Sequence, residues 1–469
     1  MKKIIYYRCA FISRGRGQHL LDQLLPAFAL AVETCTPLPR KDFVKKITKK
    51  IHSIVPGGRD RKTVDNYRTE TIGKLLGMYY FDDSDNAQIS ERTLRFLDTQ
   101  DQVQFFKEVC CKLQAPSGMS KKADVFIGDG VEIWPVSFLL KVLASADKKH
   151  GFRFLTKKEL NFFVLSNLDV LQGKRSPEDV ADLIASYRKK KKPPRIDGGS
   201  YSAQHSYEVI NLLSFANLVT VFGRGYVRLN SFEKSDIKII NDYQVNCNRF
   251  SLKEYALNLP DEKQRLNKEW MEYNSKLAYP LDGTIFSSSG TRWVQAGIGD
   301  FDLYSDADGP VELAAIEIGE AGEEYIYQKE KQRIKDKLPT ELSRVKKLGA
   351  TKGLGYDIQS VFADASPKAE NVFFIEVKST VRSSRPGKER IVVALTSNEY
   401  KAAKQFKNYF YIFKVFLVGS PEDKQIFVYS LCNPLKLKRL KKIDIVKVDG
   451  KAKYTMTFPS ELCKEVKYV

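Results

Sequence analysis

The sequence contains no run of about eighteen or more apolar residues. Its opening stretch, MKKIIYYRCAFISRGRG, interrupts a short apolar segment with arginines. A membrane-spanning helix or the apolar centre of a signal peptide requires an unbroken apolar stretch. We therefore expect a cytoplasmic protein that has no membrane partner.

Closely spaced cysteines and histidines, which could form disulfides or bind metal, are also scarce. There are only 4 histidines, and the 7 cysteines are scattered from Cys9 to Cys463 without a C-x-x-C pair. A disulfide framework or a structural zinc site needs such clusters, so we expect neither. The sequence also lacks a G-x-x-x-x-G-K-[ST] loop and helicase motifs, which argues against ATP-driven translocation.

Positive charge is what the chain has in excess. Its 469 residues include 77 Lys and Arg against 57 Asp and Glu, which gives a net charge of +20. Residues 1–250 contain 41 basic and 27 acidic residues, so this half carries +14 of that charge. A basic protein can be merely soluble, but a polyanion is the more natural partner. We predict that the N-terminal half binds double-stranded DNA.

A chain of this length exceeds a single hydrophobic core, and we predict a multidomain fold. The N-terminal half is expected to be mostly α and winged-helix-like, and the C-terminal part an α/β domain with a mixed sheet flanked by helices. The predicted regions are a helical DNA-recognition domain at 1–113, a second winged-helix-like domain at 114–241, a helical connector at 242–285, and the α/β domain at 286–469.

Two helices are predicted in the first region, over 41–51 and 61–76, from apolar residues at helical spacing. In the second region, Thr156 followed by Glu159 has the spacing of a capping box. The run Ser176 to Asp179, with proline at the first helical position, is a second helix start.

A helix predicted over 207–217 is followed by a hairpin of strands 219–222 and 226–229 around Gly223-Arg224-Gly225. Helices followed by such a hairpin are typical of a winged helix, although a helical domain closed by an exposed hairpin would have the same pattern. The cations expected to contact DNA phosphates here are Lys157, Lys158, Arg188, Lys189, Lys190, Arg224 and Arg228.

The sign of the charge reverses between Gly299 and Ile326, a segment without one Lys or Arg. Its acids are Asp300, Asp302, Asp306, Asp308, Glu312, Glu317, Glu320, Glu323 and Glu324. Carboxylates bind divalent cations, but a solvated acidic loop leading into a helix N-terminus explains most of them equally well.

Asp357 follows a glycine-rich turn at the start of a short predicted strand, and Glu376 and Lys378 share one face of the next strand. Two neighbouring strands can bring both carboxylates to one cation, with the backbone carbonyl of Val377 as a further ligand. Lys378 beside that metal can orient or help deprotonate a water and stabilise charge on phosphate. A cross-strand ion pair is the structural alternative.

The E-x-K pattern alone is weak. It recurs at Glu399/Lys401, Glu422/Lys424 and Glu465/Lys467. Only the copy at Glu376 lies in a strongly apolar β run that follows a G-Y-D strand and precedes a strand, a helix and a further strand.

The complete order is GEAGEE, GYDIQS, IEVKST, LTSNEYKAAKQF and YFYIFKV, over about residues 310–420. It closely resembles the PD-(D/E)XK nuclease superfamily, in the branch found as the C-terminal domain of the plant protein NO VEIN and beside ATPases of the McrB kind. The resemblance implies a core of a helix opened by GEAGEE, three mixed strands, a helix and a strand. The first half is similar in architecture to the tandem winged-helix recognition halves of some type II restriction enzymes.

The resemblance also implies roles for individual residues. Asp357 and Glu376 would be metal ligands, Lys378 the catalytic lysine, and Glu323 an accessory carboxylate, with Glu320 and Glu324 as neighbours that could replace it. The family's T-x-N-E element matches Thr396, Asn398 and Glu399, although Thr396 and Glu399 also have capping-box spacing. Tyr356 stands where the superfamily signature has proline.

The expected activity is that of a restriction-type DNA endonuclease that depends on Mg²⁺, with Mn²⁺ as a substitute. Two alternatives stay open: a nuclease that requires a modified base, and a non-catalytic DNA-binding or adaptor protein on a nuclease fold. Cleavage of both strands needs two copies of a single-site domain, so a homodimer is expected, at least transiently on DNA. A cognate methyltransferase is a possible further partner.

Overall fold

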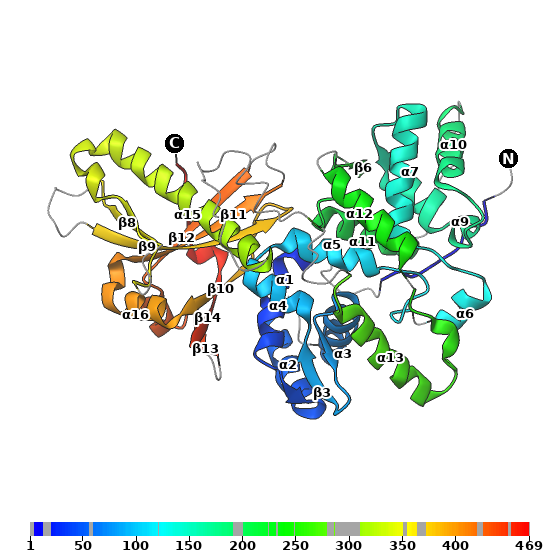
Figure 1. The fold of residues 1–469 in the computed structure, drawn as a ribbon, viewed down its shortest axis with the longest axis horizontal. Helices are drawn as coiled ribbons and strands as arrows, with labels where there is room; N and C mark the ends of the chain where they lie inside the picture. The colour runs from blue at the N-terminus through cyan, green and yellow to red at the C-terminus, as the bar shows by residue number, and fades with distance from the viewer. Residues whose placement is uncertain are drawn as a thin grey trace. The chain divides into compact units, whose positions relative to one another are not determined.

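The computed structural model forms two compact units (Figure 1). It describes residues 4–12, 20–55, 60–120, 122–190, 200–223, 225–230, 233–247, 249–278, 286, 310–349, 354–363, 372–419, 425–448 and 452–468. Unit 1 comprises residues 1–21, 35–94 and 103–286, and unit 2 comprises residues 22–34, 95–102 and 287–469. Two short segments of the N-terminal half therefore belong to the C-terminal unit.

The first part of unit 1 has a small sheet and a set of short helices. Its elements are β1 (Leu38–Pro39), α2 (Arg40–Ile54), α3 (Arg61–Asn66), η2 (Tyr67–Leu75), β2 (Tyr79–Phe81), β3 (Asn86–Ile89), α4 (Glu91–Thr99, which runs on into unit 2), α5 (Gln102–Lys112) and α6 (Ala123–Gly128). The strand order is β1-β3-β2. The helices predicted over 41–51 and 61–76 are confirmed as α2 and as α3 with η2.

The second part of unit 1 repeats this strand arrangement. Its elements are α7 (Pro135–His150), β4 (Leu155–Thr156), α8 (Lys157–Glu159), η3 (Leu160–Leu165), α9 (Leu168–Leu171), α10 (Pro177–Arg188), α11 (Ser200–Phe215), β5 (Val219–Phe222), β6 (Tyr226–Leu229) and α12 (Lys234–Asn246). The strand order is β4-β6-β5, and the predicted hairpin is confirmed. Both predicted caps are capping boxes, at Thr156/Glu159 and Ser176/Asp179.

Within the segment 242–285, expected as a connector, the described residues 249–278 instead pack into unit 1. The segment contains the end of α12, η5 (Leu252–Glu254) and α13 (Pro260–Ser275). Trp270 of α13 is 1% exposed, and its indole N–H donates to the carbonyl of Lys74 at 3.0 Å. The apolar face of α13 packs against β2 and η2, so this helix needs unit 1 for its own burial.

Unit 2 is built on a mixed sheet with strand order β15-β12-β11-β9-β8-β7. Its elements are α1 (Leu21–Glu33), α15 (Pro310–Lys337), η6 (Pro339–Arg344), β7 (Lys346–Lys347), β8 (Ile358–Val361), β9 (Val372–Arg382), β10 (Arg390–Thr396), α16 (Ser397–Phe406), η7 (Lys407–Tyr409), β11 (Phe410–Val418), β12 (Gln425–Cys432), α17 (Pro434–Arg439), β13 (Asp444–Lys447), β14 (Lys453–Pro459), η9 (Ser460–Leu462) and β15 (Lys464–Glu465). β9 and β11 run parallel, whereas β8 and β9 are antiparallel.

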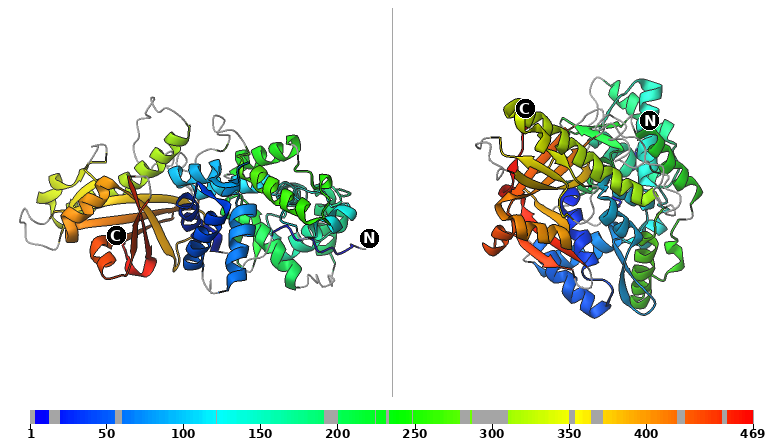
Figure 2. Two further views of the ribbon diagram at one scale, coloured as in Figure 1. Left: turned by 90° about the horizontal axis from the view of Figure 1, so that it is seen from below. Right: turned by 60° about the vertical axis from the view of Figure 1, so that its left-hand side comes forward.

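Helix α15 packs against β9, β8 and β7 on one face of this sheet (Figures 1 and 2). On the other face, α16 and a second sheet of order β10-β14-β13 close an apolar core that includes Ile412, Phe416 and Phe458. β10 therefore pairs with β14 and is not a strand of the main sheet, unlike the three-strand core that the resemblance implied.

Two further expectations change. The helix expected to open at Gly319 begins at Pro310, so the GEAGEE motif lies inside α15. Residues 299–309, which contain four of the nine acids of the acidic segment, lie outside the described residues. Among the helices of the described ranges, none is both long and apolar enough to cross a membrane.

Candidate active site and nucleic-acid interface

Asp357 is fixed by backbone contacts at the start of β8. Its N–H donates to the carbonyl of Ile375 at 2.9 Å, and its carboxylate accepts the N–H of Val377 at 2.7 Å. The preceding Gly355 has φ +78°, and a Cβ there would lie 2.4 Å from the carbonyl oxygen of Asn398. Only glycine allows this turn to approach the first turn of α16 so closely, and the approach brings Asp357 towards that helix.

Glu376 and Lys378 lie on one face of β9, and their side chains are in contact. The ammonium Nζ of Lys378 is 2.6 Å from Oε1 of Glu376 and 3.1 Å from Oε2 of Glu399. Glu376 is 3% exposed. The structure thus brings together side chains from two strands and a helix that are distant in sequence.

The carboxylate of Glu399 caps helix α16 and also contacts Lys378. Its carboxylate accepts the N–H of Thr396 at 3.0 Å and its own N–H donates to the Thr396 hydroxyl at 3.3 Å, which completes a capping box. The same carboxylate contacts Lys378. Asn398 is exposed, and its backbone rather than its side chain contacts the turn at Gly355.

Glu323 reaches the same region from α15. A Cβ on Gly349 would lie 2.4 Å from Oε2 of Glu323 and 3.5 Å from Oδ1 of Asp357, so the two carboxylates flank this glycine. Glu324 faces another partner, because its carboxylate forms an ion pair of 2.9 Å with Lys347 of β7. Of these two acids in the GEAGEE motif, Glu323 is the one beside Asp357.

The acids of this site are buried close to one another, and their pKa values are raised. Burial raises the pKa of Glu376 well above its ordinary value and, with the charge of Asp357, raises the pKa of Glu323 to about 7. Burial also raises the pKa of Asp357. For Lys378, burial lowers the pKa, but the surrounding carboxylates outweigh it and hold the pKa above its ordinary value.

This donor set fits a divalent cation. The acids supply hard oxygen ligands, and burial, the main cause of their raised pKa values, makes their negative charge costly unless a cation compensates it. In the described ranges, no three His, Cys, Asp or Glu side chains form a ready metal cluster. Mg²⁺ does not require one, since it commonly binds through one or two carboxylates and retains water.

Sequence reasoning missed two lysines near this site. Lys414 of β11 is aligned with Lys378 of β9, is 5% exposed, and donates to the hydroxyl of Thr380. Burial and the charges of Lys378 and Arg382 lower its pKa to about 7. A single lysine in the apolar run YFYIFKVFLV was a usable signal. Lys347 had none, because only the fold brings β7 beside α15.

The predicted DNA contacts lie around the β5–β6 hairpin in unit 1. Lys158 and Arg228 are exposed, and so are Lys189 and Lys190 at the end of α10. Lys157 is half-buried with its ammonium 5.4 Å from the ring of Tyr207, and burial lowers its pKa. Arg224 lies outside the described residues.

Arg188 has a structural role that the sequence did not predict. Its guanidinium forms an ion pair of 2.7 Å with Glu159, the capping-box residue of α8, and stacks 4.4 Å from the ring of Phe152. It also donates to the carbonyl of Phe154. These bonds tie α10 to the start of β4 and α8, which leaves Arg188 less available to phosphate than its exposed neighbours.

Comparison with known families agrees with this division of the chain. Residues 322–429 match the family described as Protein NO VEIN, C-terminal, and residues 2–271 match the family described as Restriction endonuclease BpuJI, N terminal. The fold and these matches define a restriction-endonuclease-related protein with a nuclease-like second unit. The chain belongs to the BpuJI N-terminal family, whose match covers more than half of its residues. The resemblances inferred from both halves of the sequence are confirmed.

A solved structure is also similar to part of the chain. It is the crystal structure of pyrene- and phenanthrene-modified DNA in complex with the BpuJ1 endonuclease binding domain. The sequence identity is 35%, the match covers 58% of this chain and 98% of that chain, and the TM-score is 0.52. No curated protein matches the chain.

Proposed function

We propose that the chain is a Mg²⁺-dependent DNA endonuclease of restriction type, which binds duplex DNA through unit 1 and cleaves it in unit 2. The observation that carries the proposal is the meeting of Asp357, Glu376 and Lys378 on neighbouring strands, with Glu323 and Glu399 beside them. Packing alone does not favour several buried acids in one place, because each must be desolvated.

Asp357 and Glu376 are the residues that would hold Mg²⁺, with Mn²⁺ as a substitute. The ion would polarise the scissile phosphate and supply a hydroxide near neutral pH. Lys378 stays protonated among its carboxylates, so it donates to a phosphate oxygen and stabilises negative charge rather than removing a proton. Glu376 and Glu399 hold that ammonium in position. Glu323, which lies beside Asp357, would be an accessory carboxylate of this site.

Unit 1 is suited to duplex DNA. Both of its sheets combine a short strand, a set of helices and a hairpin in the same strand order, which is the topology of a winged helix. Four exposed cations lie in the second part of unit 1: Arg228 on β6, Lys158 on α8, and Lys189 and Lys190 at the end of α10. The similar BpuJ1 domain was solved with DNA. We infer that these cations, together with Lys157 and Arg224, contact the phosphate backbone.

Substitutions in unit 2 test the catalytic assignment. Asp357→Asn, Glu376→Gln and Lys378→Ala are each expected to abolish cleavage of mixed phage DNA in Mg²⁺ while leaving DNA affinity nearly unchanged, because binding belongs to unit 1. Asp444→Asn, an exposed carboxylate of the same unit, is the matched control and should cleave normally. Cleavage by all three variants at the wild-type rate would remove the assignment.

One observation favours a second candidate, a DNA-binding protein without catalysis. The Glu376 carboxylate is already paired with Lys378, as in a structural ion pair. A salt-sensitive gel shift without cleavage, on methylated as well as unmodified DNA, would support this candidate. Cleavage of only the methylated DNA would instead identify a modification-dependent nuclease.

The partners expected from the sequence follow from the same proposal. A single site cuts one strand, so a double-strand break calls for two copies of the chain on DNA. Gel filtration with and without DNA measures this association. If the enzyme cleaves unmodified DNA, a cognate methyltransferase would be a further partner, because it would modify the host DNA and so protect it.

A further inference from the structure

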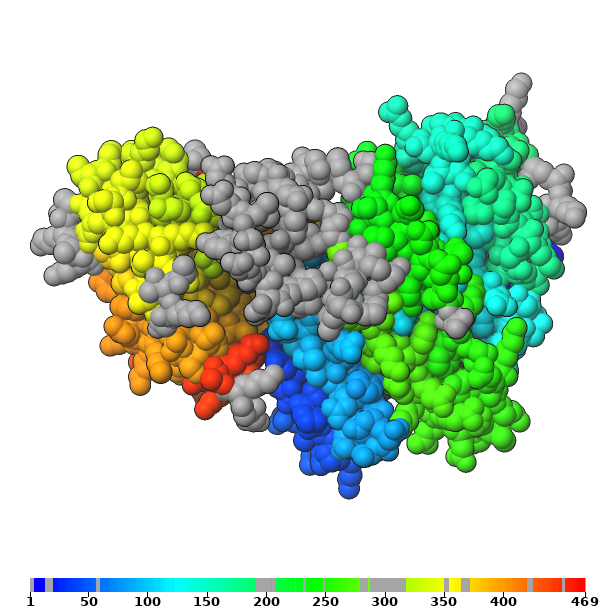
Figure 3. All heavy atoms as spheres, in the orientation of Figure 1, coloured from blue at the N-terminus to red at the C-terminus, as the bar shows by residue number. Residues whose placement is uncertain are grey.

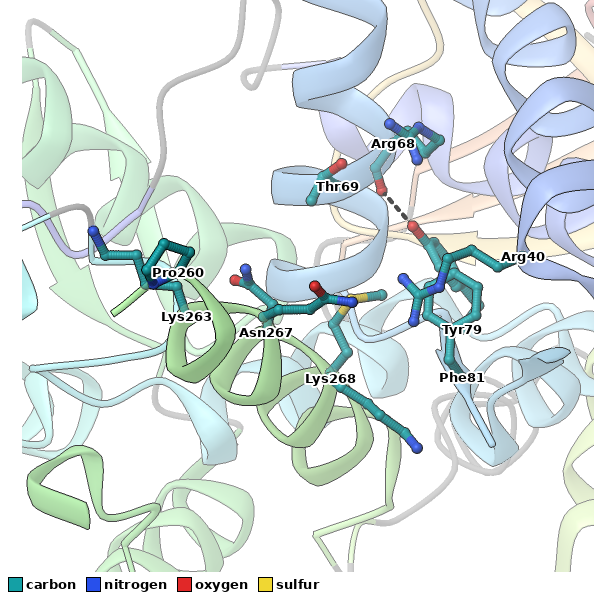
Figure 4. A pocket seen from close by; sticks show the side chains of 11 residues that line it. Arg40, Arg68, Thr69, Tyr79, Phe81, Pro260, Lys263, Asn267 and Lys268 are labelled. Carbon is teal, nitrogen blue, oxygen red and sulfur yellow. Dashed lines mark hydrogen bonds between the residues drawn. The ribbon is translucent and has the colours of Figure 1, made fainter. Parts of the chain in front are cut away.

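A basic pocket lies within unit 1, away from the predicted hairpin contacts. Its volume is about 360 Å³. One wall is a single face of α13, and the other is formed by the first residue of α2, by η2 and by β2 (Figure 4). Helix α13 is at the surface (light green in Figure 3), and Lys263 and Gln264 of its pocket-lining face are exposed. The lining residues are Arg40, Arg68, Thr69, Tyr79, Phe81, Pro260, Lys263, Gln264, Asn267, Lys268 and Met271.

The charges of this α13 pocket have one sign. Four of its lining residues are Lys or Arg and none is acidic. Three of the four cations are held from behind by acids outside the lining, which positions them without filling the cavity. The pairs are Arg40–Asp85 at 2.5 Å, Arg68–Asp65 at 3.1 Å and Lys268–Asp83 at 3.3 Å.

Several donors of the pocket have no protein acceptor. Lys263 makes no ion pair within the described ranges. The Nε of Arg68 is buried and has no hydrogen-bond partner among the described residues. A buried N–H without an acceptor is costly, so a further acceptor at this end of the pocket would be favourable.

The floor of the pocket is rigid and apolar. Tyr79 and Phe81 are buried, and the hydroxyl of Tyr79 donates to the carbonyl of Arg68 at 3.1 Å. The guanidinium of Arg40 lies 3.7 Å from the centre of the Phe81 ring, so its flat face is fixed. A fixed guanidinium plane offers a stacking surface to a nucleobase.

We propose that the α13 pocket binds a nucleotide, with its phosphate on Lys263 and its base near Arg40 and Asn267. The volume is at the lower end of the range of roughly 300–1,000 Å³ that small-molecule sites occupy, which suits one nucleotide. The ligand can be a free nucleotide or one nucleotide of a DNA strand that unit 1 binds, since both offer the same phosphate and base. The second of these rests on the proposed function, and the first does not.

Binding measurements on the full chain test the pocket without any cleavage. Deoxyadenosine monophosphate and inorganic phosphate are titrated into wild type and into Lys263→Ala, and displacement of the nucleotide by a short DNA duplex is measured. The matched control is Arg265→Ala, which removes one exposed charge from a different face of the same helix. Loss of one charge-assisted hydrogen bond should weaken nucleotide binding about tenfold or more in Lys263→Ala, while Arg265→Ala binds as wild type.

Each outcome decides the proposal. Nucleotide binding that is lost in Lys263→Ala and displaced by duplex identifies DNA as the source, and binding that duplex does not displace identifies a free nucleotide. Absence of nucleotide binding, together with equal duplex affinity in Lys263→Ala and Arg265→Ala, overturns the site. An inactive nuclease that still binds the nucleotide would refute the proposed function alone.

Discussion

Replacing Asp22 by alanine is expected to destabilise unit 2, although Asp22 is 360 positions from its partner in the sequence. The carboxylate of Asp22, on α1, accepts a hydrogen bond of 3.0 Å from Arg382 at the end of β9. Arg382 is 1% exposed and lies on the strand that carries Glu376 and Lys378. The N-terminal helix therefore stabilises the strand of the candidate active site.

The expected loss of unfolding free energy in Asp22→Ala depends on the hydrogen bonds that Arg382 keeps. Removing one partner of a buried ion pair costs about 3–5 kcal/mol, because the other charge stays buried. Arg382 would keep its bonds of 2.9 and 3.1 Å to Glu389, so we expect the lower end, about 3 kcal/mol. Against a typical domain stability of about 5–15 kcal/mol, this loss is large.

Hydrogen exchange of the β9 amides in the full chain measures the effect, because these amides report the free energy of opening in unit 2. DNA affinity serves as a separate readout for unit 1. The control is Asp444→Ala, which breaks an exposed pair with Arg390 at 3.3 Å and should cost at most about 1 kcal/mol. Asp22→Asn, which keeps an acceptor, should cost less than Asp22→Ala.

Equal protection of β9 in Asp22→Ala and Asp444→Ala would refute this reasoning. So would a soluble fragment of residues 287–469 with wild-type protection of β9, because that fragment lacks α1. Arg382→Met should cost more than Asp22→Ala, because it removes the ion-pair partner of both Asp22 and the buried side chain of Glu389.

Three further changes test other parts of the fold. Lys414→Met should stabilise the protein more at pH 7 than at pH 10, as measured by guanidinium unfolding. The pKa of Lys414 is about 7 in the folded protein, so above this pH the lysine carries a proton in the unfolded chain that it lacks in the folded one. The stability of the wild type therefore rises with pH, and the advantage of methionine shrinks. An unchanged difference between the two pH values would contradict this. Gly118→Ala should cost about 1–3 kcal/mol in a thermal melt, because its Cβ would lie 2.2 Å from the Trp270 ring. Lys107→Met should cost about 3–5 kcal/mol, since Glu233 would lose its ion pair of 2.6 Å, and a neutral result would show that the pair is dispensable.

Local features of the fold were predictable from the sequence. Both capping boxes and the β5–β6 hairpin depend on residues within a few positions of one another, so short patterns contain the information. Strand β9 and helix α16 were equally visible as an apolar β run and a T-x-N-E start. Asp357, Glu376 and Lys378 can be identified from the sequence because their motifs are short and occur in a fixed order.

Contacts between distant segments were not predictable. The ion pair of Arg188 with Glu159 was not predicted, and segment 242–285, expected as a linker, buries Trp270. The hydrogen-bond and ion-pair partners of a long side chain depend on which helices and strands pack together, and the local sequence does not contain that information.

The chain by itself therefore determined its basic first half, its local elements and the three residues of the candidate active site, since each is encoded by neighbouring side chains. Tertiary structure alone decided that α1 belongs with the nuclease-like unit, that β10 pairs with β14, and that α13 closes a basic pocket. These depend on burial and pairing between segments far apart in the chain, whose free energy exists only once both segments are folded.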